Sequence, residues 1–272
     1  MINWLHTFQP QAILLSLGPI NIYWYGLFIV LGIGAALLVS LKIARYYKLE
    51  PDKIFDISFW LIINGLIGAR LYEVLLEASY YLSNPLNIFK VWEGGLAIHG
   101  AIIAGILTII YFAKKEQVSF WNLAALFTPG LALGQAIGRW GNYFNQELFG
   151  EPTNLPWGIA INSLNRPLGY QEFTFFHPTF LYESLGLTVI FLILISLTVA
   201  LLKGKVKISQ EPVLITSVYL ILSSFLRFSL EYIKIDNTPI FLGLRWPQFF
   251  SLVIILFSFI SLIFTFHGKK NK

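Results

Sequence analysis

Residues 179–202 read TFLYESLGLTVIFLILISLTVALL, and Glu183 is the only charged residue among them. A helix needs about 20 apolar residues to cross the hydrocarbon core of a bilayer, because only a helix satisfies its own backbone hydrogen bonds there. This run is long enough to cross. Its side chains are apolar on every face, whereas a membrane β-barrel strand alternates apolar and polar residues. The run therefore predicts a transmembrane helix.

Six further runs are similar, and the composition agrees, since 56% of the 272 residues are hydrophobic and 12% are charged. We expect spans at Ile20–Leu41, Ile54–Leu76, Leu96–Ala113, Val118–Ile137, Thr179–Leu202, Pro212–Ile233 and Trp246–Phe266. The sequence thus predicts an all-α integral membrane protein, a bundle of about seven transmembrane helices. We expect residues 1–272 to form a single polytopic membrane domain, with residues 139–178 as an extracytoplasmic loop or cap.

Twelve of the 19 basic residues fall on one side of the membrane if seven spans alternate in direction. They are Lys42, Arg45, Lys48, Lys53, Lys114, Lys115, Lys203, Lys205, Lys207, Lys269, Lys270 and Lys272. An excess of Lys and Arg marks the cytoplasmic side. We therefore expect the N-terminus outside and the C-terminus in the cytoplasm. Because the net charge of +5 lies in small clusters at span ends, it does not indicate nucleic-acid binding.

The most polar boundary of a span is formed by residues 138–153, GRWGNYFNQELFGEPT. Arg139, Asn142, Asn145 and Glu147 lie close together within it. The glycines among them are Gly138, Gly141 and Gly150. Glycines let the backbone come close to whatever such side chains hold. This pattern predicts a binding site, and a helix end followed by a solvated loop is the structural alternative.

Charged residues also occur within the predicted spans. Arg227 and Glu231 stand four residues apart on one helix face and can pair, as Arg70 and Glu73 can, one turn apart. Charge inside a membrane segment costs about 2.5–3.5 kcal/mol on insertion scales and usually faces a bundle interior. We expect Arg70, Arg139 and Arg227 to face inward, near one another. Guanidinium forks suit a phosphate, while purely structural ion pairs are the alternative.

His99 and Tyr25 lie near the predicted outer ends of the third and first spans. Histidine titrates near neutral pH and can take a proton from a thiol, and the glycines at 94, 95 and 100 are expected to open space beside His99. The alternatives are a helix-packing hydrogen bond for His99 and an aromatic membrane anchor for Tyr25. Because the chain has no cysteine, any thiol in its chemistry must come from a substrate. No His-x-x-x-His pair or aspartate cluster indicates a metal site.

Motifs along most of the chain resemble those of the prolipoprotein diacylglyceryl transferases. Residues 138–150 match that family's hallmark, Gly-Arg-x-Gly-Asn-aromatic-x-Asn-x-Glu-x-x-Gly. Five other motifs accompany it: Tyr-Gly at 25–26, Gly-Ala-Arg at 68–70, Gly-Gly-Leu-Ala-Ile-His-Gly at 94–100, His-Pro-x-x-x-Tyr-Glu at 177–183 and Arg-Phe-x-x-Glu at 227–231. Two positions depart from the family pattern. Ser223 stands where many members carry a tyrosine, and Ala125 where an aspartate is common.

The resemblance implies an enzyme that moves the diacylglyceryl group of phosphatidylglycerol onto the thiol of the lipobox cysteine of a prolipoprotein, the first step of lipoprotein maturation, releasing glycerol phosphate. It implies catalytic roles for Tyr25, His99, Arg139 and Arg227. It implies substrate binding by Arg139, Gly141, Asn142, Asn145, Glu147 and Glu231. The implied partners are phosphatidylglycerol and a prolipoprotein signal peptide, in the bacterial plasma (inner) membrane with the active site towards the outer leaflet. No cofactor, metal or nucleic acid is implied.

Two other classes of protein compete with this interpretation. A transporter or flippase for an anion would also place arginines inside a bundle, but it predicts polar residues through the full membrane depth, and the first, fourth and seventh spans are nearly bare of them. A non-catalytic membrane scaffold would leave the clustering of charge at one end of the spans unexplained.

Overall fold

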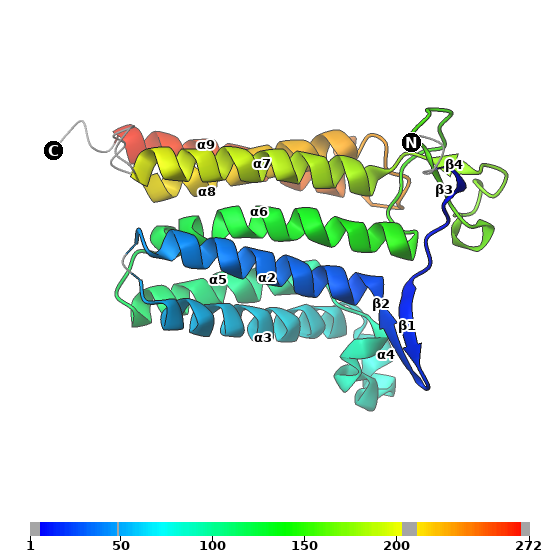
Figure 1. Cartoon of the computed structure of the whole chain (residues 1–272), viewed down its shortest axis with the longest axis horizontal. Coiled ribbons are helices and arrows are strands. Elements are labelled where there is room, and N and C mark those ends of the chain that lie inside the picture. The colour runs from blue at the N-terminus through cyan, green and yellow to red at the C-terminus, as the bar shows by residue number, and fades with distance from the viewer. Residues whose placement is uncertain (1–5, 48, 203–210, 268–272) are drawn as a thin grey trace. The chain divides into compact units, whose positions relative to one another are not determined.

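The structure is a computed structural model that describes residues 6–47, 49–202 and 211–267. Its long helices are α2 (Trp24–Ala44), α3 (Pro51–Leu76), α5 (Ile98–Lys115), α6 (Phe120–Asn145), α7 (Thr179–Leu202), α8 (Glu211–Leu230) and α9 (Trp246–His267) (Figure 1). The short helices are α4 (Ala78–Ser83), η1 (Pro85–Phe89), η2 (Val91–Glu93) and η3 (Ser163–Asn165). The strands form three antiparallel pairs: β1 (Ile13–Leu17) with β2 (Ile20–Tyr23), β3 (Ile159–Ala160) with β4 (Phe175–Phe176), and β5 (Ile240–Phe241) with β6 (Leu244–Arg245).

Each of the predicted spans corresponds to one of the long helices. Within the described residues, six of these helices, α2, α3, α5, α7, α8 and α9, are long and apolar enough to cross a membrane. Helix α6 has sufficient length at 26 residues, but Gln135, Arg139 and Asn142 are among the polar residues that reduce its hydropathy. The chain is therefore an all-α multi-pass membrane protein, as predicted. The orientation of its termini stays a prediction.

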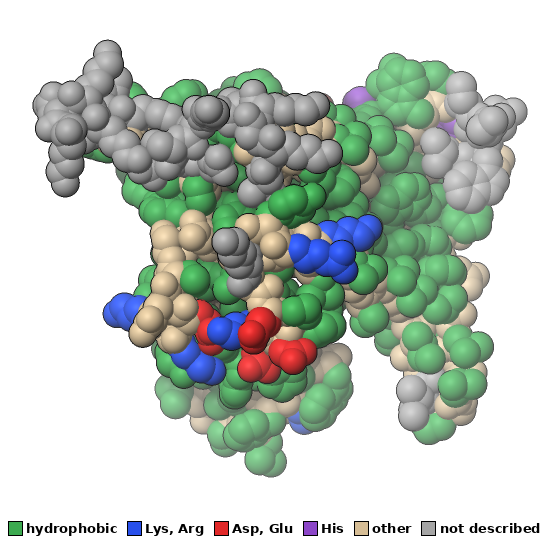
Figure 2. All heavy atoms as spheres, turned by 60° about the vertical axis from the view of Figure 1, so that its left-hand side comes forward, with side chains coloured by type: hydrophobic (Ala, Val, Ile, Leu, Met, Phe, Trp, Pro, Cys, Tyr) green, Lys and Arg blue, Asp and Glu red, His purple; other side chains and the backbone are tan. Residues whose placement is uncertain are grey.

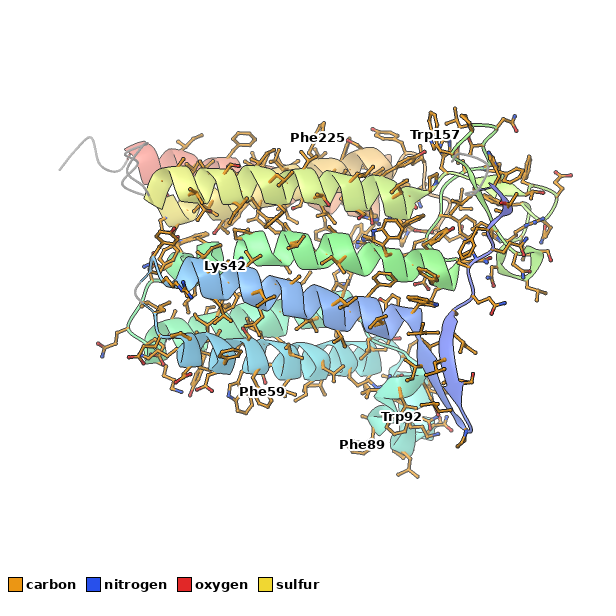
Figure 3. The ribbon with its side chains drawn as sticks, in the orientation of Figure 1. Lys42, Phe59, Phe89, Trp92, Trp157 and Phe225 are labelled. Atoms are coloured by element: carbon orange, nitrogen blue, oxygen red, sulfur yellow. The ribbon has the colours of Figure 1, made fainter. Side chains whose placement is uncertain are left out.

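Large apolar side chains on these helices are so exposed that contact with water would be energetically unfavourable. Phe59 on α3 is 56% exposed, Phe225 on α8 is 62% exposed, and Figure 3 shows both pointing outward from their helices. Extended apolar surface of this kind marks contact with a membrane or a partner. On helices long enough to span a bilayer, its natural solvent is the acyl chains of the lipids.

The first predicted span begins four residues later than expected, because its start belongs to a β-hairpin. Ile20–Tyr23 pairs with Ile13–Leu17 across a turn in which Gly18 takes a positive φ of 61°. The amide of Trp24 then donates to the carbonyl of Ala12 at 3.0 Å, and helix α2 starts there. The ladder hydrogen bonds of this hairpin therefore override the apolar run.

The chain forms two compact units, residues 1–39 with 127–272 and residues 40–126, and each is described by itself. That they make up one domain, with residues 139–178 as its extracytoplasmic cap, stays a prediction. Several basic residues of the topology argument lie outside the described residues, namely Lys48, Lys203, Lys205, Lys207, Lys269, Lys270 and Lys272.

Unit 40–126 is built on the antiparallel pair α3 and α5. Gly100 and Gly68 let the two backbones approach closely, since a Cβ at Gly100 would lie 2.1 Å from the Gly68 carbonyl oxygen. Small residues at helix crossings are typical of membrane proteins. At the other end of the pair, Lys53 and Glu116 form an ion pair at 2.7 Å. Figure 2 shows charged side chains of both signs gathered at this end.

In unit 1–39 with 127–272, α7, α8 and α9 pack together, and α2 approaches α6 where a Cβ at Gly32 would lie 2.8 Å from the Gly134 carbonyl oxygen. A buried aromatic and aliphatic cluster holds the connection between α6 and α7. Its members are Tyr143, Phe149, Ile159, Ile161, Phe176 and Phe180. The rings of Tyr143 and Phe180 stack with centroids 4.6 Å apart. This cluster fixes the connection against the ends of the two helices whose polar residues form the candidate site.

Candidate active site

The site in unit 1–39 with 127–272 is organised around the carboxylate of Glu183 on the second turn of α7. Its Oε2 lies 2.5 Å from Nε of Arg139, and its Oε1 lies 3.0 Å from Nζ of Lys234 and 3.5 Å from Nη1 of Arg227. Glu183 is 5% exposed. A buried carboxylate is tolerated when it is paired and hydrogen-bonded, and here three cations from three different parts of the chain surround it.

A second buried carboxylate, Glu231, follows the end of α8. Its Oε2 lies 2.9 Å from Nη2 of Arg227, so the predicted pair is confirmed. Its Oε1 lies 3.1 Å from Nε of Arg245, at the start of α9. Arg245 also donates to the carbonyls of Glu231, Lys234 and Asp236 and to the hydroxyl of Thr238. Arg245 therefore fixes the turn that carries Glu231 and Lys234.

Asn142 links Arg139 to Glu147. Its Oδ1 accepts from Nη1 of Arg139 at 3.4 Å, and its Nδ2 donates to Oε1 of Glu147 at 2.7 Å. Asn145 donates to the same Glu147 oxygen at 3.5 Å. Because α6 continues to Asn145, Arg139 and Asn142 lie one turn apart on its last turns, and the non-helical connection begins at Gln146. The polar residues of the hallmark thus form one hydrogen-bonded set.

Glu147 reaches back to Asn142 because the chain reverses sharply at the end of α6. Gln146 and Leu148, on either side of it, have positive φ values of 51° and 54°. Residues in this left-handed conformation commonly end a helix, although any residue other than glycine is strained there. The Gln146 side chain holds this conformation, since it donates to the Pro10 carbonyl at 2.9 Å and accepts from the Asn162 amide at 2.7 Å.

Two hallmark glycines are required by close packing. A Cβ on Gly141 would lie 2.6 Å from the ring of Tyr25, which brings Tyr25 on α2 against α6. A Cβ on Gly150 would lie 2.6 Å from the Ile233 carbonyl oxygen, and Gly150 forms an antiparallel bridge with Lys234. These two glycines thus admit a neighbouring ring and a neighbouring carbonyl, while a close approach of the backbone to a bound ligand stays a prediction. At Gly138 a Cβ would meet only ordinary contacts, 3.8 Å from Ile29.

The balance of charge in this set favours an anion. Arg139, Arg227, Lys234 and Arg245 face the buried carboxylates Glu183 and Glu231, so positive charge is in excess. Burial lowers the pKa of Lys234, while the adjacent carboxylate of Glu183 opposes that effect. The side chains of Arg139 and Arg227 are 32% and 33% exposed, whereas those of Glu183, Glu231 and Lys234 are at most 6% exposed. Arg139 and Arg227 are therefore the most exposed cations of the set and the best placed to reach a ligand.

Arg70 does not share this function. It is 6% exposed, and its guanidinium donates to the backbone carbonyls of the segment that precedes α5. These carbonyls belong to Asn87, Ile88, Lys90, Gly94 and Gly95. The expectations that Arg70 pairs with Glu73 and joins the other arginines around an anion are therefore wrong. Buried carbonyls at the end of a helix need donors, and Arg70 supplies them.

His99 lies in unit 40–126, at the start of α5, where its ring packs 5.8 Å from that of Tyr72. Gly100 was expected to open space beside His99. It instead permits the close approach of α3. The part of His99 in catalysis stays a prediction, as does that of Tyr25. Of the two departures, Ser223 donates within α8 to the Leu220 carbonyl at 3.4 Å, and Ala125 is fully buried.

Three residues of the cluster were not predicted as site residues: Glu183, Lys234 and Arg245. A signal was available for Glu183, the only charge in its apolar run and the last residue of a family motif. Lys234 and Arg245 lie near predicted span ends, where interfacial lysines and arginines are ordinary. Among the described residues, no group of three His, Cys, Asp or Glu side chains could hold a metal ion.

The fold and the site define a multi-pass membrane protein with partly exposed arginines, held by buried carboxylates, at the ends of its helices. Residues 12–264 match the family model described as prolipoprotein diacylglyceryl transferase. The chain belongs to the prolipoprotein diacylglyceryl transferase family, so the resemblance of its motifs is confirmed and the chain is a transferase.

Relatives named phosphatidylglycerol–prolipoprotein diacylglyceryl transferase are similar over almost their whole length. One from Trichormus variabilis is 42% identical over 96% of this chain and 92% of its own. One from Synechococcus elongatus is 41% identical, over 97% of this chain and 90% of its own. One from a Synechocystis species is 40% identical, over 97% and 92%.

Proposed function

We propose that Arg139 and Arg227 together bind the phosphate of phosphatidylglycerol in this family's reaction. The chain transfers the diacylglyceryl group of that lipid to a prolipoprotein, the first step of lipoprotein maturation. The observation that carries our proposal is the shared carboxylate of Glu183, which holds both guanidiniums while about a third of each arginine side chain stays exposed. Planar guanidinium forks recognise phosphate with two parallel hydrogen bonds each.

The reaction has to form a thioether and release glycerol phosphate. The thiol of the lipobox cysteine loses its proton, because the thiolate is the nucleophile. Its sulfur then bonds to the glyceryl carbon next to the phosphate, and the bond between that carbon and the phosphate oxygen breaks. The electron pair stays on the oxygen, so the leaving phosphate gains a negative charge. Arg139 and Arg227 would stabilise that charge as it develops, with donors already fixed in place by Glu183 and Glu231.

His99 and Tyr25 are the two candidates for assisting the loss of the thiol proton. The ring of Tyr25 packs against Gly141 of the hallmark, which supports a place for it at the site. His99 belongs to the other compact unit, and its candidacy rests on the family motif and on the chemistry of imidazole. The variant His99→Gln keeps polarity but cannot act as a base. A full transfer rate for this variant at neutral pH would remove His99 from the mechanism.

Five other hallmark or motif residues complete the proposed site. Asn142 and Asn145 bind Glu147, and we assign the exposed Glu147 to the glycerol head of the lipid. Glu231 orients Arg227. Gly141 admits Tyr25 against α6. A preorganised set of this kind saves the cost of ordering side chains around each new substrate.

We place the enzyme in the bacterial plasma (inner) membrane with its site towards the outer leaflet. The predicted basic clusters support this side. Lys42 lies at the opposite end of α2 from Tyr25, and Lys53 at the opposite end of α3 from Arg70. Lys114 and Lys115 lie at the opposite end of α5 from His99. An exported prolipoprotein would present its lipobox cysteine at the outer leaflet.

The test follows labelled glycerol from phosphatidylglycerol vesicles to a lipobox peptide. We expect label on the cysteine peptide, none on a matched peptide with serine in its place, and none with Arg139→Ala. Arg45→Ala removes an exposed arginine from the opposite end of α2 and should transfer normally. Absence of label from both peptides, with folded wild-type protein, would contradict the transfer reaction and favour a test of anion flux.

A further inference from the structure

The segment between α3 and α5 presents a row of large apolar side chains that no other part of its unit covers. It contains α4, η1 and η2, spans residues 77–93, and is called here the 77–93 segment. Leu82, Leu86, Phe89 and Trp92 are 83%, 76%, 74% and 76% exposed. Figure 3 shows Phe89 and Trp92 on these short helices, beyond the end of α3. Four large apolar residues so exposed within eleven positions would be costly in water.

This exposure does not come from a loosely held loop. Arg70, on α3, donates to carbonyls of the segment and of the two glycines that follow it. Its guanidinium also lies 5.1 Å from the centre of the Tyr81 ring, and Tyr81 is 7% exposed. The inner face of the segment is therefore fastened to α3. Its outer face is presented in a fixed arrangement.

Several polar side chains of the segment find partners within it, as an environment poor in water favours. Nδ2 of Asn87 donates to the Tyr80 hydroxyl at 2.7 Å, and Nδ2 of Asn84 donates to the Tyr80 carbonyl at 3.1 Å. The hydroxyl of Ser83 donates to the Ser79 carbonyl at 3.0 Å. Lys90 and Glu93 form an ion pair at 3.4 Å.

The exposed face continues a surface that already meets lipid. Helix α3 is a membrane span, and Leu71, Leu75 and Leu76 at its end are 56%, 76% and 62% exposed. The 77–93 segment follows Leu76 without a linker. Tryptophan and tyrosine are enriched at the boundary between acyl chains and headgroups, and short amphipathic segments lie in that plane.

We propose that the 77–93 segment lies in the membrane–water interface, with Leu82, Leu86, Phe89 and Trp92 inserted among the lipids. Arg70 holds it at a fixed depth. The motif at residues 94–100, which contains His99, follows the segment directly. The segment therefore sets the depth of that motif in the membrane. This proposal does not depend on which reaction the enzyme performs.

The absence of native cysteine permits a direct test. Single cysteines replace Phe89 or Trp92, carry a nitroxide label, and are studied in phosphatidylglycerol and phosphatidylcholine vesicles. The ratio of collisions with oxygen to collisions with a water-soluble nickel chelate reports depth. Glu93→Cys is the matched control, because neighbouring residues of a 3₁₀-helix point about 120° apart. Transfer activity of each labelled protein confirms that it is folded.

We expect oxygen to dominate at positions 89 and 92 and the nickel chelate to dominate at position 93. Nickel access at 89 and 92 equal to that at 93 would show that the segment stands in water and overturn the proposal. Low access to both reagents would also overturn it, because a protein partner would then cover the face. In a second measurement, Arg70→Lys in the Phe89→Cys background should make the label more mobile and shift it towards nickel access. Unchanged mobility would refute the role of Arg70.

Discussion

Replacing Glu183 by glutamine is the sharpest perturbation of this site. The change keeps the shape of the side chain and removes the charge that Arg139, Lys234 and Arg227 share. Breaking a buried ion pair by removing one partner costs about 3–5 kcal/mol, because the other charge is left uncompensated. Most of this cost should come from Lys234, whose side chain is 1% exposed, since water can reach the two arginines.

The double variant Glu183→Gln with Lys234→Met separates stability from catalysis. Removing both partners of a buried pair is often nearly neutral, so we expect the double variant to recover most of the lost free energy of unfolding. Transfer should not recover, because Arg139 and Arg227 still lack their common acceptor. Misplacing a binding group by about 1 Å can cost about 100-fold in rate, and we expect a loss of that order in kcat/KM.

The sign of the pH dependence provides an independent check. Burial lowers the pKa of Lys234 and Glu183 opposes this effect, so Glu183→Gln should lower that pKa further. A lysine whose pKa is lower in the folded than in the unfolded state destabilises the folded protein, and this destabilisation is complete at a pH below the folded-state pKa. It disappears as the pH rises towards the unfolded-state pKa. The stability gap between Glu183→Gln and wild type should therefore narrow as the pH rises.

The assays are thermal unfolding in detergent across pH and lipid transfer to a lipobox peptide. Recovery of both stability and transfer in the double variant would refute a positioning role for Glu183. The role of the Glu183 carboxylate would then be limited to neutralising the charge of Lys234. A single variant with wild-type unfolding and wild-type transfer would refute the energetic argument as well.

Three further predictions concern single positions. Arg139→Lys keeps the charge but loses the fork, and transfer should fall about 100-fold, as for other lost transition-state donors; near-normal transfer would contradict a bidentate phosphate clamp. Gly141→Ala places a Cβ 2.6 Å from the Tyr25 ring and should both destabilise by about 1–3 kcal/mol and slow transfer by displacing that ring, and an unchanged rate in folded protein would argue against Tyr25 as a site residue. Gly100→Ala places a Cβ 2.1 Å from a carbonyl oxygen of α3 and should lower the free energy of unfolding by about 1–3 kcal/mol. Its control is Gly105→Ala, whose Cβ would have its nearest contact at 4.0 Å and which should unfold like wild type.

The sequence by itself determined the fold class, because lipid cannot satisfy backbone hydrogen bonds and a span must appear as an unbroken apolar run. It also predicted the pairing of Arg227 with Glu231, which lie four residues apart on one helix face. The motifs determined the family. These are local properties of the chain or comparisons of its residues.

Only the tertiary structure decided which charges share a carboxylate. Glu183, Arg139 and Lys234 come from α7, α6 and the turn after α8, and no local spacing brings them together. The same is true of Arg70, whose partners are carbonyls of a later segment, and of the crossing of α3 and α5 at Gly68 and Gly100. The physical reason is that ion pairs, close helix crossings and strand pairing form between distant parts of the chain, where the packing of the whole unit selects the partners.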